Sequence, residues 1–328
     1  MPENSFDPHP LLRNGHLMTV ASNFWPRSFA LPPPEERLFL VAEESRILGH
    51  CHWQPGPRAN SPALVLVHGL EGSSDSGYML GIAEKAFALG FHAIRLNQRN
   101  CGGTERLTPT LYNSGLSGDY RAVLEDLIQR DGISQLFFAG YSMGGNLVLK
   151  MAGELSSSAP AALRGVAAVC PALDLAACAD ALEKPENFFY QRHFVRKLLQ
   201  RYAVKSALFP ALYSPNGFGP IRTVRQFDDA ITAPHFGFRD AQDYYQHSSA
   251  SNVVPNIRVP TLVLTAQDDP FIPCAPFLSC GIPQNSAITF EAPARGGHCA
   301  FLSSHPGSRR FWAEQRILSF FQSLLASA

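Results

Sequence analysis

A serine stands between two glycines in the segment Gly140-Tyr-Ser-Met-Gly144. The apolar run Leu136–Ala139 precedes this segment and a helix-like run, Asn146–Lys150, follows it. This context is typical of a sharp strand-to-helix turn, in which small neighbours let the two elements cross closely and the Ser142 hydroxyl is pushed out of the sheet edge. An exposed hydroxyl can attack a carbonyl carbon, and the backbone amide of Met143 then points at the oxygen that gains charge.

Two further loops carry groups that could activate such a serine. Asp268 and Asp269 follow the apolar run Thr261–Thr265, and His298 follows two glycines after the run Ala287–Phe290. Because parallel strands end at the same edge of a sheet, we expect these loops to meet Ser142 there. In the chain order serine, aspartate, histidine, the histidine takes the serine proton and the aspartate holds the other ring nitrogen.

The position of the acid pair alone leaves two candidates, because neighbouring side chains point in different directions and only one can reach His298. Alignment with the usual Gly-x-x-Asp turn puts Ala266 at the glycine position and the acid at Asp269, which leaves Asp268 as a turn or capping residue. The loop after the run Ala63–Val67 begins His68-Gly-Leu70 and should supply the second oxyanion amide, that of Leu70. We expect His68 itself to be structural.

The predicted catalytic site therefore consists of Ser142, Asp269 and His298, with the backbone amides of Leu70 and Met143. It requires no metal and no organic cofactor. Motifs for other chemistries are missing from the sequence: there is no G-x-x-x-x-G-K-[ST] phosphate loop, no G-x-G-x-x-G at the first strand-helix turn and no H-E-x-x-H.

The elements that must position these loops alternate between strand and helix. Strands are expected at 36–42, 47–53, 63–67, 91–96, 136–139, 165–170, 261–265 and 287–290, the first two as an antiparallel hairpin. Helices are expected at 78–89, 119–129 and about 309–325. This βαβ spacing predicts an α/β fold with a mostly parallel sheet and helices on both faces.

One interval, from about Leu173 to Pro255, has no clear buried strand but contains helical segments rich in aromatic residues. We interpret residues 173–255 as a helical cap inserted into a core formed by 1–172 and 256–328, with an N-terminal extension at 1–35. The alternative is a separate helical domain. The cap aromatics either line an acyl-binding pocket or form the cap's own core. They are Phe188, Phe189, Tyr190, Phe194, Phe227, Phe236, Phe238, Tyr244 and Tyr245.

The composition of the 328 residues is that of a globular enzyme, with 45% hydrophobic and 16% charged residues. Lys+Arg and Asp+Glu are both 27, so charge gives no reason to expect nucleic acid or an anionic membrane as a partner. Seven scattered cysteines without a C-x-x-C pair favour reduced thiols in a cytoplasmic protein. No secretory signal is visible, and the uncharged run Ile133–Leu149 is too short for a membrane span.

Several segments together resemble the YheT-like branch of the α/β-hydrolases, which includes bacterial esterases and eukaryotic ABHD-type esterase/lipase relatives. They are His68–Tyr78, Asn97–Gly103, Gly140–Asn146, Phe227–Pro234, Asp243–Tyr245, Asp268–Pro270 and Gly296–His298, with Asn14–Thr19 as the leading segment. The resemblance implies an α/β-hydrolase fold and a serine hydrolase of carboxylic esters. It also agrees with Asp269 as the acid. Asn100 departs from the usual glycine after Arg99, but asparagine tolerates a positive φ.

The sequence thus predicts an enzyme that cleaves small-molecule esters, either short- or medium-chain acyl esters or acylglycerols, through an acyl-enzyme on Ser142. The same site could serve an acyltransferase in which an alcohol replaces water. The third alternative is a non-catalytic binding protein on a hydrolase scaffold, since a fold does not imply activity. The acyl chain, the alcohol and the oligomeric state are not encoded in any pattern that we find.

Overall fold

The computed structural model describes residues 5–214 and 218–326. In this part of the chain, eight strands form one sheet in the order β1-β2-β4-β3-β5-β6-β7-β8. Their bounds are β1 Glu35–Ala42, β2 Ser45–His52, β3 Ala63–Val67, β4 His92–Leu96, β5 Leu136–Tyr141, β6 Leu163–Val169, β7 Thr261–Leu264 and β8 Ile288–Glu291. β1 pairs with β2 and β2 with β4 in antiparallel fashion, and every other neighbouring pair is parallel. The mostly parallel sheet and the hairpin are confirmed.

The burial of the strands explains why these runs fold as they do. Every residue of β3, β4 and β5 is buried. Central strands covered by helices on both faces need continuous apolar sequence, whereas β1 at the sheet edge carries mostly exposed residues. The apolar runs that mark the central strands are therefore a direct consequence of their position in the sheet.

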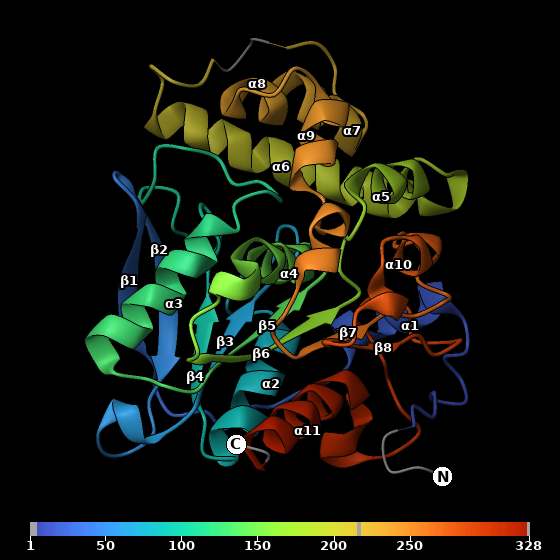
Figure 1. The fold of residues 1–328 in the computed structure, drawn as a ribbon. Helices are drawn as coiled ribbons and strands as arrows, with labels where there is room; N and C mark the ends of the chain where they lie inside the picture. Colours follow the sequence, from blue (N-terminus) through green and yellow to red (C-terminus); the bar gives the residue numbers. More distant parts are fainter. Residues whose placement is uncertain (1–4, 215–217, 327–328) are drawn as a thin grey trace.

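Helices cover both faces of the sheet (Figure 1). α2 (Gly77–Ala88) and α11 (Trp312–Ala326) pack together, as do α3 (Gly118–Asp131) and α4 (Met143–Leu155). Two helices were not expected from the sequence pattern: α1 (Gly15–Phe24) and the short α10 (Ala275–Ser279). Both lie beside the β7–β8 end of the sheet in Figure 1.

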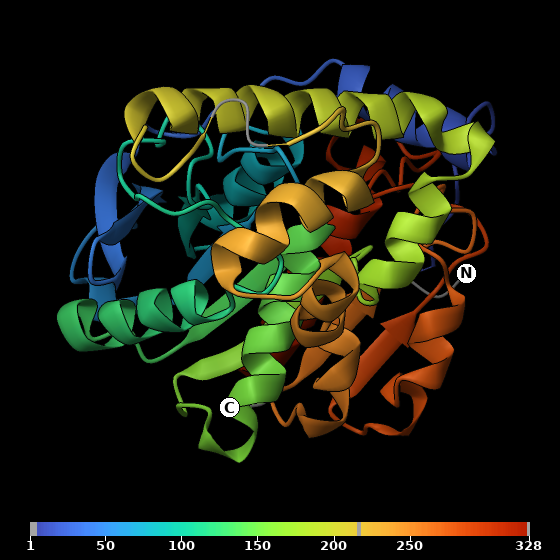
Figure 2. The ribbon, with the colours of Figure 1, turned by 90° about the horizontal axis from the view of Figure 1, so that it is seen from above.

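The segment between β6 and β7 contains α5 (Leu175–Leu182), α6 (Phe188–Leu208), α7 (Val224–Phe227), α8 (Ala233–Phe236) and α9 (Ala241–Ser248). A π-helical turn, Asp228–Thr232, joins α7 to α8. We call α5–α9 the cap helices, because they form a layer over one end of the sheet (Figures 1 and 2). Residues 215–217, in the loop between α6 and α7, lie outside the described part of the chain.

Polar contacts fasten the cap helices to the sheet and its loops. Arg201 of α6 binds both carboxylate oxygens of Glu71, at 2.8 Å each, and both side chains are largely buried. The Tyr244 hydroxyl of α9 accepts a 2.8 Å hydrogen bond from the Ser114 amide, and the Asn146 side chain donates to Ser248 O at 3.0 Å. Because a buried, unpaired charge is costly, the Arg201–Glu71 pair strongly favours one position of α6 over the core.

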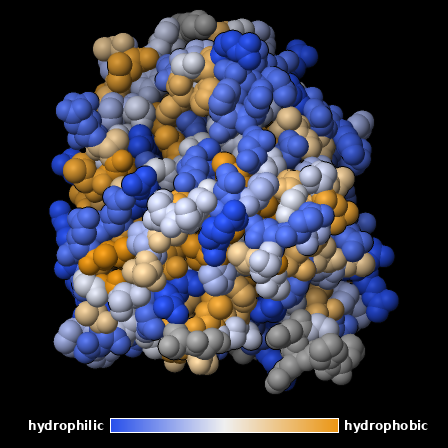
Figure 3. All heavy atoms as spheres, viewed as in Figure 1, coloured by the Kyte–Doolittle hydropathy of each residue, from blue (hydrophilic) through white to orange (hydrophobic). Residues whose placement is uncertain are grey.

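The described residues include no helix that is both long and apolar enough to cross a membrane. On the face shown in Figure 3, apolar residues appear as patches between hydrophilic ones. The largest apolar side chains exposed on the cap are those of Phe188 and Phe189, which are 56% and 80% exposed. These two aromatics therefore belong neither to a pocket nor to the core of the cap.

Candidate active site

Ser142 sits directly between β5 and α4 with a strained backbone, at φ 55° and ψ −119°. A positive φ is unfavourable for a residue with a side chain and is kept only where the surroundings enforce it. The flanking glycines are required: a Cβ on Gly140 would lie 2.1 Å from Gly144 O, and one on Gly144 would lie 2.4 Å from Val67 O. The sharp turn predicted from the sequence is present.

His298 and Asp269 meet at the same end of the sheet. His298 Nδ1 lies 2.8 Å from Asp269 Oδ2, and the Asp269 side chain has no exposed surface. The other oxygen, Oδ1, accepts the amides of Phe271 at 3.1 Å and Ile272 at 3.0 Å. The Phe271 ring packs on the imidazole with ring centroids 4.2 Å apart. The imidazole is thus fixed by a hydrogen bond at one nitrogen and by the tilted Phe271 ring packed against it.

Asp268 faces a different group from its neighbour. Its Oδ1 accepts the amide of Gly297 at 2.9 Å, so it holds the backbone of the loop that carries His298. Asp269 therefore binds the imidazole, whereas Asp268 binds the backbone of the loop that carries it.

Ser142 and His298 line one cavity but share no hydrogen bond within the described residues. Long or absent serine–histidine contacts are common before substrate binds. Burial opposes the charged imidazole, but the neighbouring Cys299 and Asp269 outweigh burial and raise the pKa of His298. The raised pKa means that the imidazole, once protonated, holds its proton more tightly than a free histidine does.

Two backbone amides near Ser142 form no hydrogen bond with any described residue. The amides of Gly69 and Glu71 donate to the hydroxyls of Tyr78, at 3.0 Å, and Tyr112, at 3.2 Å. Within the described residues, the amides of Leu70 and Met143 donate to no protein group. Free amides at this position are well placed for an oxygen of a ligand, because buried N–H groups are otherwise almost always paired.

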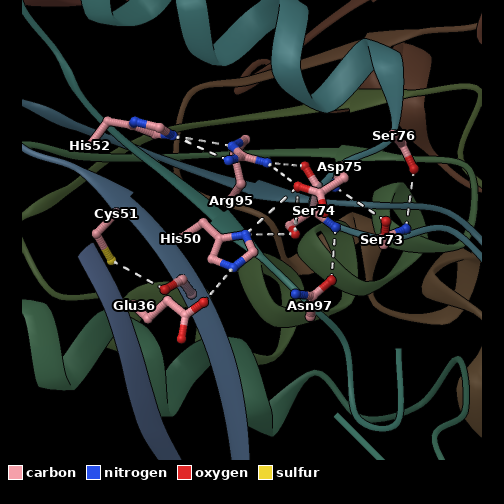
Figure 4. Close-up of polar contacts among 11 residues, drawn as sticks. Glu36, His50, Cys51, His52, Ser73, Ser74, Asp75, Ser76, Arg95 and Asn97 are labelled. Carbon is pink, nitrogen blue, oxygen red and sulfur yellow. Dashed lines mark hydrogen bonds and ion pairs between the residues drawn. The ribbon is translucent and has the colours of Figure 1, made fainter. Parts of the chain in front are cut away.

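A cluster of polar side chains holds the loop that follows Leu70 against the sheet (Figure 4). Arg95 of β4 donates to Ser74 O and to Asp75 at 2.9 Å, while the Ser74 amide donates to the Asn97 side chain at 2.8 Å. The Ser74 hydroxyl lies 2.9 Å from His50 Nδ1 of β2. These bonds fix the loop 73–76 against two strands, so the preceding turn with Leu70 has little freedom to move.

His68 is structural in the fold, as expected. It is fully buried, with Nδ1 2.7 Å from Gly69 O and Nε2 accepting the Gln98 amide at 3.1 Å. Burial, partly offset by the bond to Gly69, lowers the pKa of His68 to about 4. Asn100 has φ 65°, so the expected tolerance of a positive φ is used here.

The sequence pattern did not predict that α1 contacts the loop that carries His298. The Thr19 hydroxyl accepts the backbone amide of His298 at 2.8 Å and donates to Gly15 O at 2.7 Å. A Cβ on Gly297 would lie 2.7 Å from Gly15 O, so the glycine before His298 permits this close approach. The segment Asn14–Thr19 was the only signal in the sequence, and it carried no chemistry of its own.

Two cavities meet at Ser142. The first, of about 110 Å³, is mostly apolar and is lined by Met143 and by cap residues that include Leu175, Leu182, Phe194, Leu198, Phe227, Tyr244 and Tyr245. The second, of about 510 Å³, is more polar and is lined by His298, Cys299, Gly69, Tyr190 and residues of α1. Leu70, Phe194 and Phe271 border both cavities. The site therefore has room on two sides of the serine.

Comparisons with known proteins identify the family to which the chain is similar. Residues 62–304 match the model of a family described as the alpha/beta hydrolase fold. The chain is 30% identical over 95% of its length, and 91% of the other, to the Escherichia coli (strain K12) protein named "Putative esterase YheT". It is also 30% identical to the monoacylglycerol lipase of Saccharomyces cerevisiae (strain ATCC 204508 / S288c), over 81% of this chain and 61% of that protein.

Among solved structures, Est1E from Butyrivibrio proteoclasticus superposes with a TM-score of 0.57 at 13% identity, covering 89% of this chain and 99% of Est1E. At this identity the likeness shows the fold alone. The match to the family model covers most of the chain, and the similarity to the YheT protein is nearly full-length. The chain is therefore a member of the α/β-hydrolase fold family, in its YheT-like branch.

Proposed function

We propose that this protein is a serine hydrolase that cleaves carboxylic esters through a covalent acyl-enzyme on Ser142. The observation that carries the proposal is the arrangement around one sheet edge: a strained serine, a histidine held by a buried carboxylate, and two amides without a partner among the described residues. Relatives named as esterase and lipase support the same reaction class.

In the proposed mechanism, His298 Nε2 removes the proton of Ser142 as its oxygen attacks the ester carbonyl. Asp269 holds Nδ1, which fixes the tautomer and stabilises the imidazolium that forms. The amides of Leu70 and Met143 bind the oxyanion of the tetrahedral intermediate, which is worth about 3–4 kcal/mol for each donor. His298 then gives its proton to the leaving alcohol, and water releases the acyl group by the same steps.

This proton transfer assigns the two cavities to the two halves of the ester. The leaving alcohol must lie on the side of the imidazole, and His298 lines the larger, more polar cavity. The acyl chain then occupies the apolar cavity under the cap helices, whose walls suit a hydrocarbon. We therefore propose an acyl ester with a short or medium chain and an alcohol part that tolerates a polar surrounding.

A fluorophosphonate probe tests the proposal, because it reacts covalently with an activated serine. We expect the intact protein to be labelled and the Ser142→Ala variant to stay unlabelled. The same variant should lose at least about a thousandfold in turnover of p-nitrophenyl esters while its unfolding transition is unchanged, because attack and not folding is removed. Full labelling of Ser142→Ala would refute the assignment of the nucleophile.

The same experiment decides between the alternative functions. An intact protein that neither reacts with the probe nor turns over esters would be a binding protein on a hydrolase scaffold. If added ethanol diverts the acyl group from free acid to ethyl ester, the protein is an acyltransferase, because both reactions share the acyl-enzyme. Ester hydrolysis is the proposal here, with a cytoplasmic location as its expected setting.

A further inference from the structure

The fold brings together two cysteines and the proposed catalytic histidine, although the sequence separates them widely. Cys170 follows β6, and Cys299 lies 129 residues further along, next to His298. One possible ligand atom of each of the three residues lies within 4.8 Å of the others, and this is the only such trio of ligating side chains among the described residues. Both cysteines are free thiols.

The spacing within this trio suits a tetrahedral metal ion bound by sulfur and nitrogen. With metal–sulfur and metal–nitrogen bonds of about 2.3 and 2.0 Å, the ligand atoms of such a site lie roughly 3.5–3.8 Å apart. Cys299 Sγ is 3.7 Å from His298 Nε2, the ring nitrogen that Asp269 leaves free. Small side-chain rotations would therefore bring all three atoms onto one ion.

The surroundings resemble the outer shell of a metal site. Asp269 holds the far nitrogen of His298, as carboxylates do in carboxylate–histidine–metal arrangements. The Cys299 amide donates to Cys170 Sγ at 3.3 Å, a bond that stabilises charge on sulfur. His298 and Cys299 line the larger cavity together with Ser142, which gives an ion a way in and leaves a fourth position for water or the serine hydroxyl.

We propose that Cys170, Cys299 and His298 form an inhibitory site for a thiophilic divalent cation such as Zn²⁺. Both cysteines bind as thiolates and release their protons to solvent, so the bound ion is neutralised. The ion binds His298 Nε2, the atom that must accept the Ser142 proton. Ester hydrolysis is therefore inhibited until the ion dissociates. The inhibition rests on the proposed function, whereas the binding site does not.

The test is a Co²⁺ titration of reduced, tag-free protein, followed by absorption spectroscopy. We expect one Co²⁺ per chain, a thiolate-to-cobalt charge-transfer band, and displacement of the cobalt by Zn²⁺. Cys170→Ser should weaken binding at least about tenfold, because a serine hydroxyl is a poor ligand for these ions. The matched control is Cys101→Ser, which changes a buried thiol outside the trio and should bind cobalt as the unaltered chain does.

The activity readout is separate. Micromolar Zn²⁺ should abolish ester turnover by the intact protein, and EDTA should restore it. The same Zn²⁺ concentration should have little effect on ester turnover by Cys170→Ser. Cobalt binding without the thiolate band, or equal binding by Cys170→Ser, overturns the site. Thiolate-type binding with undiminished turnover overturns the inhibition. If the protein hydrolyses no ester at all, the proposed function fails, and the cobalt spectrum still decides the site.

Discussion

At the scale of single residues, the adjacent carboxylates of Asp268 and Asp269 accept hydrogen bonds from different groups. Asp269 reaches the imidazole with one oxygen and two backbone amides with the other, while Asp268 reaches the amide of Gly297. An amide oxygen can replace a carboxylate as acceptor from a backbone N–H. It cannot stabilise an imidazolium to the same extent, and the side-chain NH₂ of asparagine favours the wrong histidine tautomer.

We therefore expect Asp269→Asn to lower kcat by about 10⁴, in line with the loss found when a triad acid is replaced by its amide. Asp268→Asn serves as the matched control and should cost far less, since Gly297 keeps an acceptor. Steady-state kinetics on one p-nitrophenyl ester measures both variants. A larger kcat loss at Asp268 would reverse the assignment of the acid.

At the scale of elements, the cap helices supply most of the apolar wall beside Ser142. Four of the aromatics singled out in the sequence, Phe194, Phe227, Tyr244 and Tyr245, line the apolar cavity. Phe227 also belongs to the cap's own cluster with Leu198 and Tyr202, so the same ring is part of both the cavity wall and the core of the cap. The buried carboxyl of Asp228 lies on the same wall.

The cap should set the preference for acyl chain length. Burial of each methylene is worth about 0.8 kcal/mol, so kcat/KM should rise about fourfold per added carbon until the cavity is full. Phe227→Leu widens the wall and should move the optimum to longer esters. Phe189→Leu makes the same change at an exposed position of α6 and should leave the optimum in place. An unchanged profile from two to sixteen carbons in Phe227→Leu would show that the cap does not select the chain.

The cap should also become less stable as pH rises through the range in which Asp228 titrates. Burial raises the pKa of Asp228 to about 6, although the hydroxyls of Tyr245 and Thr232 each donate to it at 2.7 Å. Since the unfolded value is about 3.9, the folded state holds the extra proton between about pH 4 and 6. Its stabilising effect is complete below pH 4 and is lost above pH 6, a change of about 3 kcal/mol.

Denaturant unfolding of the intact protein and of Asp228→Asn, at pH 4.5 and 7.5, measures this effect. The variant does not titrate here, so its stability relative to the unaltered chain should increase at the higher pH. A difference that is the same at both pH values would contradict the prediction.

At the scale of the whole molecule, α1 connects the N-terminal part of the chain to the loop that carries His298. Two further contacts join the N-terminal part of the chain to α11: Arg27 pairs with Glu314 at 2.7 Å, and the Phe6 ring packs on Trp312 with centroids 5.2 Å apart. The histidine loop is thus held from Asp268 on one side and from α1 on the other.

Thr19→Val removes the acceptor of the His298 amide while it keeps the shape of the side chain. We expect a kcat loss of about tenfold that exceeds any change in KM, because the imidazole is misplaced whereas the valine keeps the shape of the cavity wall to which Thr19 belongs. Stability should fall by about 1–3 kcal/mol, the cost of a buried amide without a partner. Ser22→Ala, in the same helix, removes a hydroxyl that donates to Thr19 O and forms no hydrogen bond with the histidine loop among the described residues, so it is the control for kinetics and unfolding. Equal losses in the two variants would exclude a positioning role for Thr19.

The strands and the chain order of the three proposed catalytic residues were predictable, because both follow from local patterns. β3 was predicted to the residue from its continuous apolar run. The two loops at one sheet edge predicted that an acid would meet His298, and the Gly-x-x-Asp alignment together with the family resemblance selected Asp269, which is the acid bonded to His298 in the structure. Contacts between distant segments leave no such pattern. Neither the bond from His298 to Thr19 nor the meeting of Cys170 with Cys299 can be read from residues that are 279 and 129 positions apart.

The separation of Thr19 from His298 has a consequence for how the protein becomes active during synthesis. At about 5–20 residues per second, α1 leaves the ribosome about 14–56 s before the loop that it must hold. The strained serine can form with β5 and α4 well before then, since those neighbours are close in the chain. A nascent chain arrested before residue 298 should therefore contain the formed serine turn but should neither react with the fluorophosphonate probe nor hydrolyse an ester. Both activities should appear only when the loop that carries His298 packs onto α1.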